Sequence, residues 1–412
     1  MVMSLRRAHA KVEVHCIVGD GLESDARSGL EDVEVSCIWH TELVPRFGRS
    51  ALAVAGHWYA GGTPQSIAEM AALVRERSGG FAPTVCLTFS PAPFLAAAFA
   101  EAPTVHFELG IVSRAPFPVT GYLDNRGGFK TSTPYLAHES IARFEPSSEA
   151  RAMVQGICDD ALGFIKARNP FTRLMLESRA GHENVVLVAL QSSRHYAYQA
   201  HADFQEPYDL LLNTLKAVAP STLVVATEHP LYPVLSRSTL DYLRRRFPNL
   251  LFDDAFRELP AASQYLMEFC QAVVTVNSSV GLQAMIWDRP LVVAGQSHLA
   301  PYAASSVLGD LPRVLSGEIA PPAPGAVLAW NLTRYSIPFD LLFEGGVFPK
   351  RLEAAILCHR ERRPETFFDD DFAPLPEIAG AYRSALSAAM TAAVSPAPAA
   401  GTPEGRVIQL FV

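Results

Sequence analysis

Short apolar runs that alternate with amphipathic segments constrain the fold of this chain more than any other feature. In the second half of the chain the runs are rich in valine and leucine, and segments with helical periodicity separate them. The runs cover residues 185–190, 222–226, 250–252, 272–276 and 290–294. Runs of this kind are typical of strands that are buried on both faces of a parallel sheet. The alternation therefore predicts a doubly wound α/β unit.

The first half shows the same alternation less regularly. We expect strands at residues 11–18, 33–39, 51–55, 84–89 and 104–107, and helices at residues 64–79 and 92–102. Residues 108–135 break the pattern, because glycine, proline and isolated polar residues leave no sustained period. A loop of this length inside a compact domain is typical of a functional segment, and its aromatic residues argue against disorder.

The length of 412 residues is more than one hydrophobic core usually supports, so two domains are expected. Two α/β units of the Rossmann-like class would face each other across a cleft. The predicted division is residues 1–145 for the first unit, 146–183 for a helical linker, 184–330 for the second unit, 331–393 for helices that pack across both, and 394–412 for a mobile tail.

Composition narrows the classes of function. The net charge of −8 argues against a dedicated nucleic-acid binder. No apolar run is long enough to span a bilayer, and the six cysteines are scattered without a CxxC pair, which favours a reduced, cytoplasmic protein. We expect no metal or cofactor, because the acidic run at residues 369–371 lies in a proline-rich surround and His195, His201 and Asp203 match no metal-ligand spacing.

The apolar run at residues 272–276 ends in three small polar residues, Asn277, Ser278 and Ser279, and a helical segment begins at residue 280. Free backbone N–H groups and hydroxyls at the start of a helix form an anion site, and phosphate is its usual occupant. Gly281 would let a ligand or another backbone come close. The alternative is an ordinary helix cap, since serine and asparagine are preferred capping residues.

Other polar residues also follow apolar runs. Gln191 and the sequence Glu228-His229-Pro230 end two strands of the second unit, and Glu108 ends a strand of the first. Ligands of open α/β sheets bind at the carboxyl ends of strands, so these residues would line one cleft. His229, held extended by Pro230, could donate to a leaving phosphate, or it could be a plain loop histidine. Glu228 could bind a sugar hydroxyl, pair with an arginine, or be solvated.

Three residues of the first unit complete the predicted site. Glu108 is a candidate general base or nucleophile, and the alternative is a structural ion pair. Arg114 could hold a carboxylate or phosphate in bidentate fashion. Asp124 is a further candidate catalytic carboxylate, but its surround, Leu123 to Gly127, favours a turn.

These motifs resemble those of one family of enzymes. His229-Pro230 followed by Ser278-Ser279 resembles the HP and SS motifs of bacterial glycosyltransferases that use CMP-activated acidic sugars, among them sialyltransferases and the capsule transferases of 3-deoxy-manno-octulosonate (Kdo). Glu108-Leu109-Gly110 resembles their acidic-x-Gly motif. The sequence from Val274 to Met285 looks especially like capsular polysaccharide synthesis proteins of the Kdo-transferase type.

The resemblance implies a fold and a set of roles. The fold would be GT-B-like, with His229 and the two serines on the CMP phosphate and with Glu108 as the catalytic carboxylate. Two departures are visible. Glu228 stands where the capsule family often has lysine, and the segment after Gln191 lacks the aspartate that the family often carries there. If that aspartate is the nucleophile of a retaining mechanism, this chain lacks it.

The sequence thus predicts a metal-independent glycosyltransferase that moves Kdo or a sialic-acid-like sugar from a CMP-sugar to a polysaccharide or lipid-linked acceptor. We expect it to lie in the cytoplasm. Peripheral association with the inner membrane or with a capsule-assembly complex is compatible with the sequence. Two alternatives stay open. One is a transferase or epimerase that uses a UDP- or GDP-sugar, and the other is a non-catalytic glycan-binding protein of capsule assembly.

Overall fold

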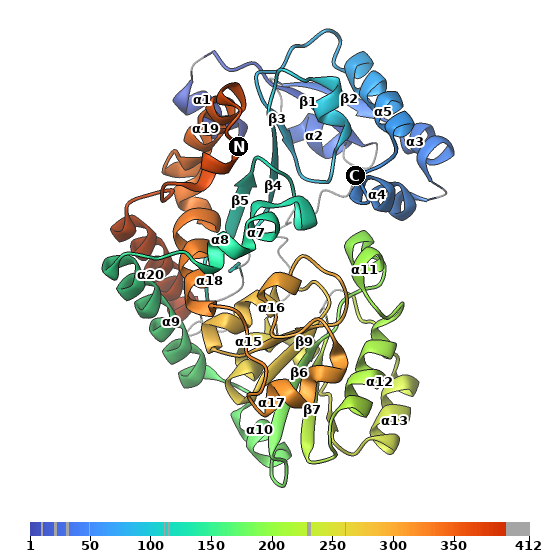
Figure 1. Ribbon diagram of the computed structural model, residues 1–412, viewed down its shortest axis with the longest axis vertical. Coiled ribbons are helices and arrows are strands. Elements are labelled where there is room, and N and C mark those ends of the chain that lie inside the picture. Colours follow the sequence, from blue (N-terminus) through green and yellow to red (C-terminus); the bar gives the residue numbers. More distant parts are fainter. Residues whose placement is uncertain are drawn as a thin grey trace.

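A five-stranded parallel sheet forms the lower part of the molecule (Figure 1). The computed structural model describes residues 1–9, 11–19, 23–29, 33–48, 50–110, 112–113, 116–228, 232–259 and 261–392. The strands of this sheet are β6 (Asn184–Ala189), β7 (Thr222–Thr227), β8 (Leu250–Leu251), β9 (Ala272–Thr275) and β10 (Leu291–Val293). Their spatial order is β10-β9-β6-β7-β8, and every neighbouring pair is parallel.

That order makes the sheet doubly wound. The chain moves outward from β6 to β7 and β8, and then returns to the other side of β6 for β9 and β10. The direction reverses between β6 and β9, which is the topological switch point where ligands of such sheets bind. The prediction of a doubly wound α/β unit in the second half is confirmed. We call the part of the molecule built on this sheet the lower lobe.

Side chains of each strand alternate between two cores, as the period of two in a strand requires. Val186 and Val188 of β6 lie in the core covered by α12 (Pro207–Ala217) and α13 (Arg237–Arg246). Leu187, on the other face, belongs to a second core that extends to Phe107 in the first half of the chain. Full burial of a side chain such as Leu187 contributes about 2–3 kcal/mol, so this shared core ties the two halves together.

Short helices connect the strands of the lower lobe. They are α11 (Tyr196–His201), α14 (Ala255–Glu258), α15 (Ala262–Leu266) and α16 (Val280–Gln283), beside α12 and α13. The helical segment expected to begin at residue 280 is divided into α16 and a 3-10 segment, Ala284–Trp287.

The first half forms the upper lobe, and its strands are divided between two sheets (Figure 1). A parallel pair consists of β1 (His15–Gly19) and β2 (Glu34–Ile38). In the second sheet, β3 (Cys86–Thr88) pairs in parallel with β4 (Thr104–Leu109), whereas β5 (Thr120–Asp124) and β11 (Ile337–Pro338) run antiparallel to their neighbours. The α/β class is confirmed, but the expectation of a purely parallel sheet in this half is wrong.

Two local expectations for the upper lobe are also wrong. Residues 51–55, expected as a strand, begin the helix α4 (Ala51–Tyr59). The hydroxyl of Ser50 accepts a hydrogen bond from the N–H of Ala53 at 3.2 Å and caps this alanine-rich segment. Residues 108–135 contain the buried strand β5, in which Gly121 is necessary because a Cβ there would lie 2.9 Å from the ring of Phe107.

The remaining elements of the first half complete the upper lobe. They are α1 (Val2–Ala8), α2 (Glu23–Gly29), α3 (His40–Phe47), α5 (Pro64–Arg77), α6 (Phe94–Ala98), a 3-10 turn at Phe129–Thr131, α7 (Thr133–Leu136) and α8 (His138–Ala142).

Long helices run along one side of both lobes. The helix α9 (Ser148–Arg168) ends before Pro170, where the sequence predicts a break, and α10 (Thr172–Ser178) follows. The C-terminal helices are α17 (Leu311–Leu315), α18 (Pro324–Trp330), α19 (Val347–Glu361) and α20 (Leu375–Ala392). The helix α20 packs along α9, and α19 packs on α1 (Figure 1). The tail that we expected to be mobile lies outside the described residues, and the domain boundaries stay a prediction.

Candidate functional site

The ends of β6 and β9 are joined by a side chain at the switch point. The Oε1 atom of Gln191 accepts a hydrogen bond from the N–H of Asn277 at 2.9 Å, and it lies 3.2 Å from the hydroxyl of Thr275. That hydroxyl is also 2.9 Å from the carbonyl oxygen of Ala189. Two of the polar strand ends that the sequence places on one rim are therefore in direct contact.

In the segment Asn277–Ser279, several hydrogen-bond donors and one acceptor have no partner among the described residues. The Oγ atom of Ser278 accepts from the N–H of Val280 at 3.3 Å, whereas the side chain of Ser279, at the N-cap position, makes no capping hydrogen bond. Among the described residues, no acceptor is hydrogen-bonded to the N–H groups of Ser278 and Ser279. The Oδ1 atom of Asn277 is buried and has no partner in this part of the chain. All three residues are partly exposed, so a ligand could reach these groups.

Gly281 has a packing role in the structure. A Cβ at this position would lie 3.0 Å from the side chain of Leu291 and 3.2 Å from that of Leu299. Glycine therefore lets α16 approach β10 and the segment that follows it. Whether Gly281 also contributes to donor binding stays a prediction.

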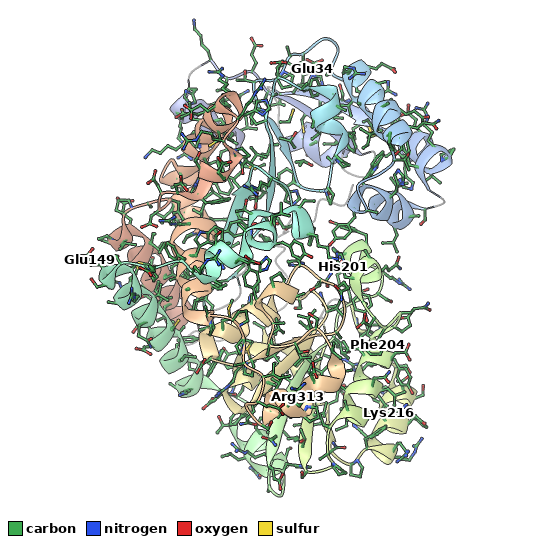
Figure 2. The ribbon with its side chains drawn as sticks, in the orientation of Figure 1. Glu34, Glu149, His201, Phe204, Lys216 and Arg313 are labelled. Atoms are coloured by element: carbon green, nitrogen blue, oxygen red, sulfur yellow. The ribbon has the colours of Figure 1, made fainter. Side chains whose placement is uncertain are left out.

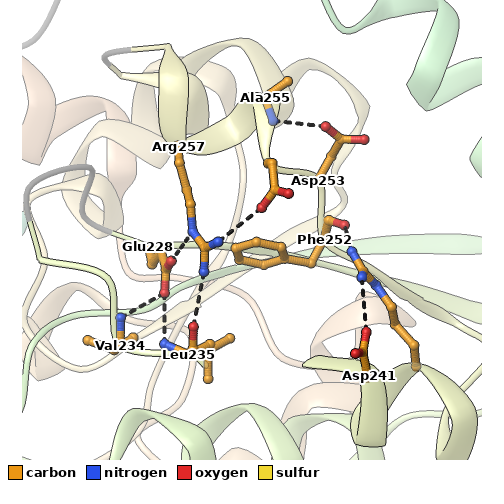
Figure 3. Close-up of polar contacts among 10 residues, drawn as sticks. Glu228, Val234, Leu235, Asp241, Phe252, Asp253, Ala255 and Arg257 are labelled. Atoms are coloured by element: carbon orange, nitrogen blue, oxygen red, sulfur yellow. Dashed lines mark hydrogen bonds and ion pairs between the residues drawn. The ribbon is translucent and has the colours of Figure 1, made fainter. Parts of the chain in front are cut away.

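Glu228 forms a buried ion pair with Arg257, as Figure 3 shows. Its Oε2 atom accepts hydrogen bonds from the N–H groups of Val234 and Leu235, at 2.9 and 3.1 Å. The guanidinium of Arg257 also reaches Asp254 at 3.0 Å and lies over the ring of Phe252. Of the alternatives for Glu228, the pairing with an arginine is the one that the structure contains, and its buried carboxylate has no surface left for a sugar hydroxyl.

Three predicted residues lie outside the described part of the chain. His229 and Pro230 follow Glu228 directly, and Arg114 lies between β4 and β5 in the sequence. Their predicted roles stay predictions.

Glu108 stands near the end of β4, opposite Tyr122 of β5. Burial raises the pKa of its carboxyl group, and a hydrogen bond of 2.8 Å from the N–H of Leu109 to Oε1 lowers it by less. Burial raises the pKa of Tyr196, which belongs to the lower lobe, and the charge of Glu108 raises it further. No lysine, arginine or histidine of the described residues pairs with it, and the ion-pair alternative is therefore not seen.

Asp124 is completely buried at the end of β5. Its carboxylate accepts hydrogen bonds from the N–H of Arg126 at 2.9 Å, from the N–H of Thr133 at 2.7 Å and from the hydroxyl of Tyr335 at 3.2 Å. Burial raises the pKa of Asp124 to about 6, although these hydrogen bonds oppose the shift. The contacts are those of a turn, and a catalytic role for Asp124 would need this turn to rearrange.

A cluster of rings between the lobes was not predicted. We call Tyr59, Phe129, His195, Tyr196, His201 and His298 the interlobe ring cluster. The ring of Tyr59 lies 4.9 Å from His201 and 5.3 Å from Phe129, and Phe129 lies 5.3 Å from His298. Tyr196 stacks on His195 at 4.5 Å and contacts Tyr59 at 5.2 Å. The hydroxyl of Tyr59 is hydrogen-bonded to Nε2 of His201, which Figure 2 labels beside the upper lobe.

Burial lowers the pKa of all three histidines of the interlobe ring cluster. Burial lowers the pKa of His201 to about 4 and that of His298 to about 3. The Nδ1 atoms of both are buried, and neither has a partner among the described residues. A sequence signal was present, because the segment after Gln191 holds two histidines and two tyrosines within residues 195–201, but it carries no metal-ligand spacing.

Three further observations concern a groove, metal binding and membrane spans. A groove of about 450 Å³ lies between α9 and α20, lined by residues that include Phe164, Arg168 and Arg383, and contains none of the predicted site residues. No group of three or more His, Cys, Asp or Glu in the described ranges is placed to hold a metal ion. No helix in that part of the chain combines the length and apolar character that a membrane span requires.

Comparison with known proteins finds similarity to proteins of capsule polysaccharide biosynthesis. Residues 165–304, which include β6 to β10 and the switch point, match the family model of capsule polysaccharide biosynthesis proteins. The resemblance to capsule polysaccharide synthesis proteins is confirmed. A stretch of 172 residues is 28% identical to the capsule polysaccharide export protein KpsS of Escherichia coli, and it covers 40% of this chain and 41% of KpsS. The chain thus matches about two fifths of the length of this relative.

Similar solved structures include two of KpsC from Thermosulfurimonas dismutans. The β-Kdo 2,7-transferase is 13% identical with a TM-score of 0.43, covering 82% of this chain and 100% of its own. The β-Kdo 2,4-transferase is 12% identical with a TM-score of 0.40, covering 78% and 91%. A UDP-GlcNAc 2-epimerase from Methanocaldococcus jannaschii is 10% identical with a TM-score of 0.32, covering 77% and 98%.

Proposed function

We propose that this chain is a glycosyltransferase of capsule polysaccharide synthesis that moves an acidic sugar from a CMP-sugar to a polysaccharide or lipid-linked acceptor. The observation that carries the proposal is the meeting of Gln191 with Asn277–Ser279 at the switch point of the lower sheet. This point lies within the residues that match the capsule family. Nucleotides bound to doubly wound sheets occupy that crevice.

The donor phosphate would lie on the segment from Asn277 to Ser279. The N–H groups of Ser278 and Ser279 and the hydroxyl of Ser279 would donate to its oxygens, because no described residue uses these donors. His229 would donate a further hydrogen bond to the phosphate that leaves, and Pro230 would hold it extended. Arg114 would pair with a negative charge of the donor. Fixed donors of this kind stabilise the leaving charge without a metal ion.

Glu108 would act on the acceptor from the opposite lobe. As the acceptor hydroxyl attacks the anomeric carbon, its proton passes to the carboxylate of Glu108. The bond between the anomeric carbon and the phosphate oxygen breaks, and its electron pair stays on the phosphate of CMP. The raised pKa of Glu108 favours this role, since a general base works best with a pKa near the operating pH. The other role, attack of the carboxylate on the anomeric carbon, would make a covalent intermediate.

The choice of nucleotide can be tested by thermal unfolding. The full chain is heated with CMP, UDP or GDP at equal concentrations, and the midpoint of unfolding is compared with that of the free protein. A ligand at about 100 times its Kd stabilises the folded state by about 2.7 kcal/mol, so CMP should raise the midpoint by several degrees. A rise with UDP or GDP but not with CMP would remove the donor assignment and favour the alternative with those nucleotides.

A further inference from the structure

Two buried imidazole nitrogens of the interlobe ring cluster have no hydrogen-bond partner among the described residues. They are the Nδ1 atoms of His201, at the end of α11, and of His298, in the segment after β10. Both segments follow the carboxyl ends of strands, as ligand-binding residues of such sheets do. A buried polar atom that is left unsatisfied is costly, so a pair of them at one interface indicates a missing hydrogen-bond partner.

The lower lobe holds the two histidines together. The N–H of Gln296 donates to the carbonyl oxygen of His201 at 2.8 Å, and Ala202 forms a bridge with Gly295. Gly295 has a φ of +132°, and a Cβ there would collide with the carbonyl oxygen of His201. Glycine at this position therefore allows the segment that carries His298 to lie against the end of α11.

The upper lobe contributes rings and one cation. Phe129 has a φ of +54°, a conformation that bulky residues rarely adopt, and its ring lies between Tyr59 and His298. Burial lowers the pKa of His201, and the charge of Lys130, the residue after Phe129, lowers it further. Backbone strain at a residue whose ring contacts the opposite lobe is typical of a functional site.

The hydrogen bond between Tyr59 and His201 determines which atom can donate. Burial raises the pKa of Tyr59, so its hydroxyl is protonated and can donate to Nε2 of His201. The proton of the neutral imidazole then sits on Nδ1, the atom without a partner. A donor N–H among buried rings, within reach of the charge of Lys130, is suited to a negatively charged oxygen.

We propose that His201, His298 and Lys130 form an anion subsite between the lobes that holds the carboxylate of the acidic sugar. The inference rests on the proposed function, because it names the part of the donor that this region contacts. The segment after Gln191, which lacks the family's usual carboxylate, thus supplies donors to a charged group of the substrate. The same chemistry would also suit a phosphate, and the experiment separates the two.

The test measures binding of three probes by calorimetry to the full chain: CMP, free Kdo, and freshly prepared CMP-Kdo. The variants are His201→Leu, His298→Leu, His298→Asn and Lys130→Met. Asparagine keeps an N–H near the position of Nδ1, whereas leucine removes it. The control is His182→Leu, because His182 precedes β6 at the opposite end of the sheet and its Nδ1 is likewise buried without a partner in the described chain.

Loss of a hydrogen bond to a charged group should weaken CMP-Kdo binding by about 10- to 100-fold in each leucine variant. Free Kdo should lose affinity in the same variants, and CMP should bind as before. His298→Asn and the control should retain the affinity of the wild type. Lys130→Met, a change at a partly exposed residue, should weaken the binding of CMP-Kdo about fivefold. This variant tests the subsite even if a leucine variant does not fold.

Other outcomes would overturn the inference in distinguishable ways. Equal losses for CMP and CMP-Kdo would assign the subsite to phosphate instead of carboxylate. Unchanged affinities in all variants would remove the subsite while the CMP-sugar assignment stands. Binding of Kdo that depends on the histidines, without any binding of CMP, would keep the subsite and remove the proposed donor. Wild-type protein that binds none of the probes would remove both.

Discussion

The lower lobe is built on one parallel sheet, whereas the upper lobe divides its strands between a parallel pair and a mixed sheet. In the lower lobe all five carboxyl ends meet at one edge, and this is where Gln191 contacts Asn277. In the upper lobe β5 is reversed, and hydrogen bonds to the carboxylate of Asp124 hold the turn that follows it. In the proposed function the regular lobe would hold the nucleotide, and the irregular lobe would hold the acceptor.

We expect the largest loss of activity when Glu108 is replaced, and this variant separates the chemistry of the upper lobe from binding in the lower lobe. Glu108→Gln keeps the size of the side chain but removes the base, so transfer from CMP-Kdo should fall by about 10²- to 10⁴-fold. The affinity for CMP should not change, because the nucleotide is assigned to the other lobe. Release of CMP and formation of product are measured by chromatography.

The control for this prediction is Glu101→Gln, an exposed residue that precedes β4. It should retain full activity. A fully active Glu108→Gln enzyme would contradict the role of Glu108, and a loss of CMP binding would contradict the division of labour between the lobes.

A second prediction concerns the stability of the lower lobe. Glu228→Gln removes the charge that pairs with Arg257, and breaking a buried pair costs about 3–5 kcal/mol. Because the Arg257 side chain is 22% exposed, we expect about 2–3 kcal/mol of lost unfolding free energy, measured with urea. The control Asp254→Asn, at the exposed partner of Arg257, should cost less than about 0.5 kcal/mol. Equal costs for both variants would contradict the structural role of Glu228.

A third prediction uses pH to examine the upper lobe. The pKa of Asp124 is about 6 in the folded state and 3.8 in the unfolded reference, so the folded protein keeps the proton between these values. The stabilisation is fully present below about pH 4 and is lost as the pH rises through 6, a change of about 3 kcal/mol. Lowered pKa values of His201 and His298 act in the opposite direction, since their stabilisation is lost as the pH falls below 6.5.

Comparison with Asp124→Asn isolates the contribution of Asp124. The difference in unfolding free energy between wild type and variant, measured with urea at several pH values, should shrink by about 3 kcal/mol between pH 4 and pH 7. A difference that does not depend on pH would show that the buried carboxylate of Asp124 does not titrate as its surroundings imply.

The contrast between the lobes also explains what the sequence could predict. The strands of the lower lobe are continuous apolar runs with polar ends, so their existence, order in the chain and shared rim followed from local patterns. The pairing of β5 with β11 joins residues more than 200 positions apart, and no local pattern reports it. The start of α4 was mistaken for a strand because a short apolar run fits either structure until its cap at Ser50 is considered.

The candidate site also has one part that the sequence predicted and one part that it did not. Gln191 and the segment Asn277–Ser279 were found because both follow strands directly. The interlobe ring cluster was missed because its members come from four separate segments that meet only in the folded chain. In the structure a Cβ at Gly128 would collide with His106, but the sequence alone shows only a glycine before Phe129, which is typical of an ordinary turn.

In the proposed function the switch point of the lower lobe binds the phosphate of CMP. This binding is measured by titration calorimetry of CMP into wild-type protein and into the double variant Ser278→Ala/Ser279→Ala, with Ser221→Ala at the opposite end of the sheet as control. We predict that the double variant binds CMP about 10- to 100-fold more weakly and that the control binds like wild type. Equal affinity for CMP in the wild type and the double variant would contradict the claim.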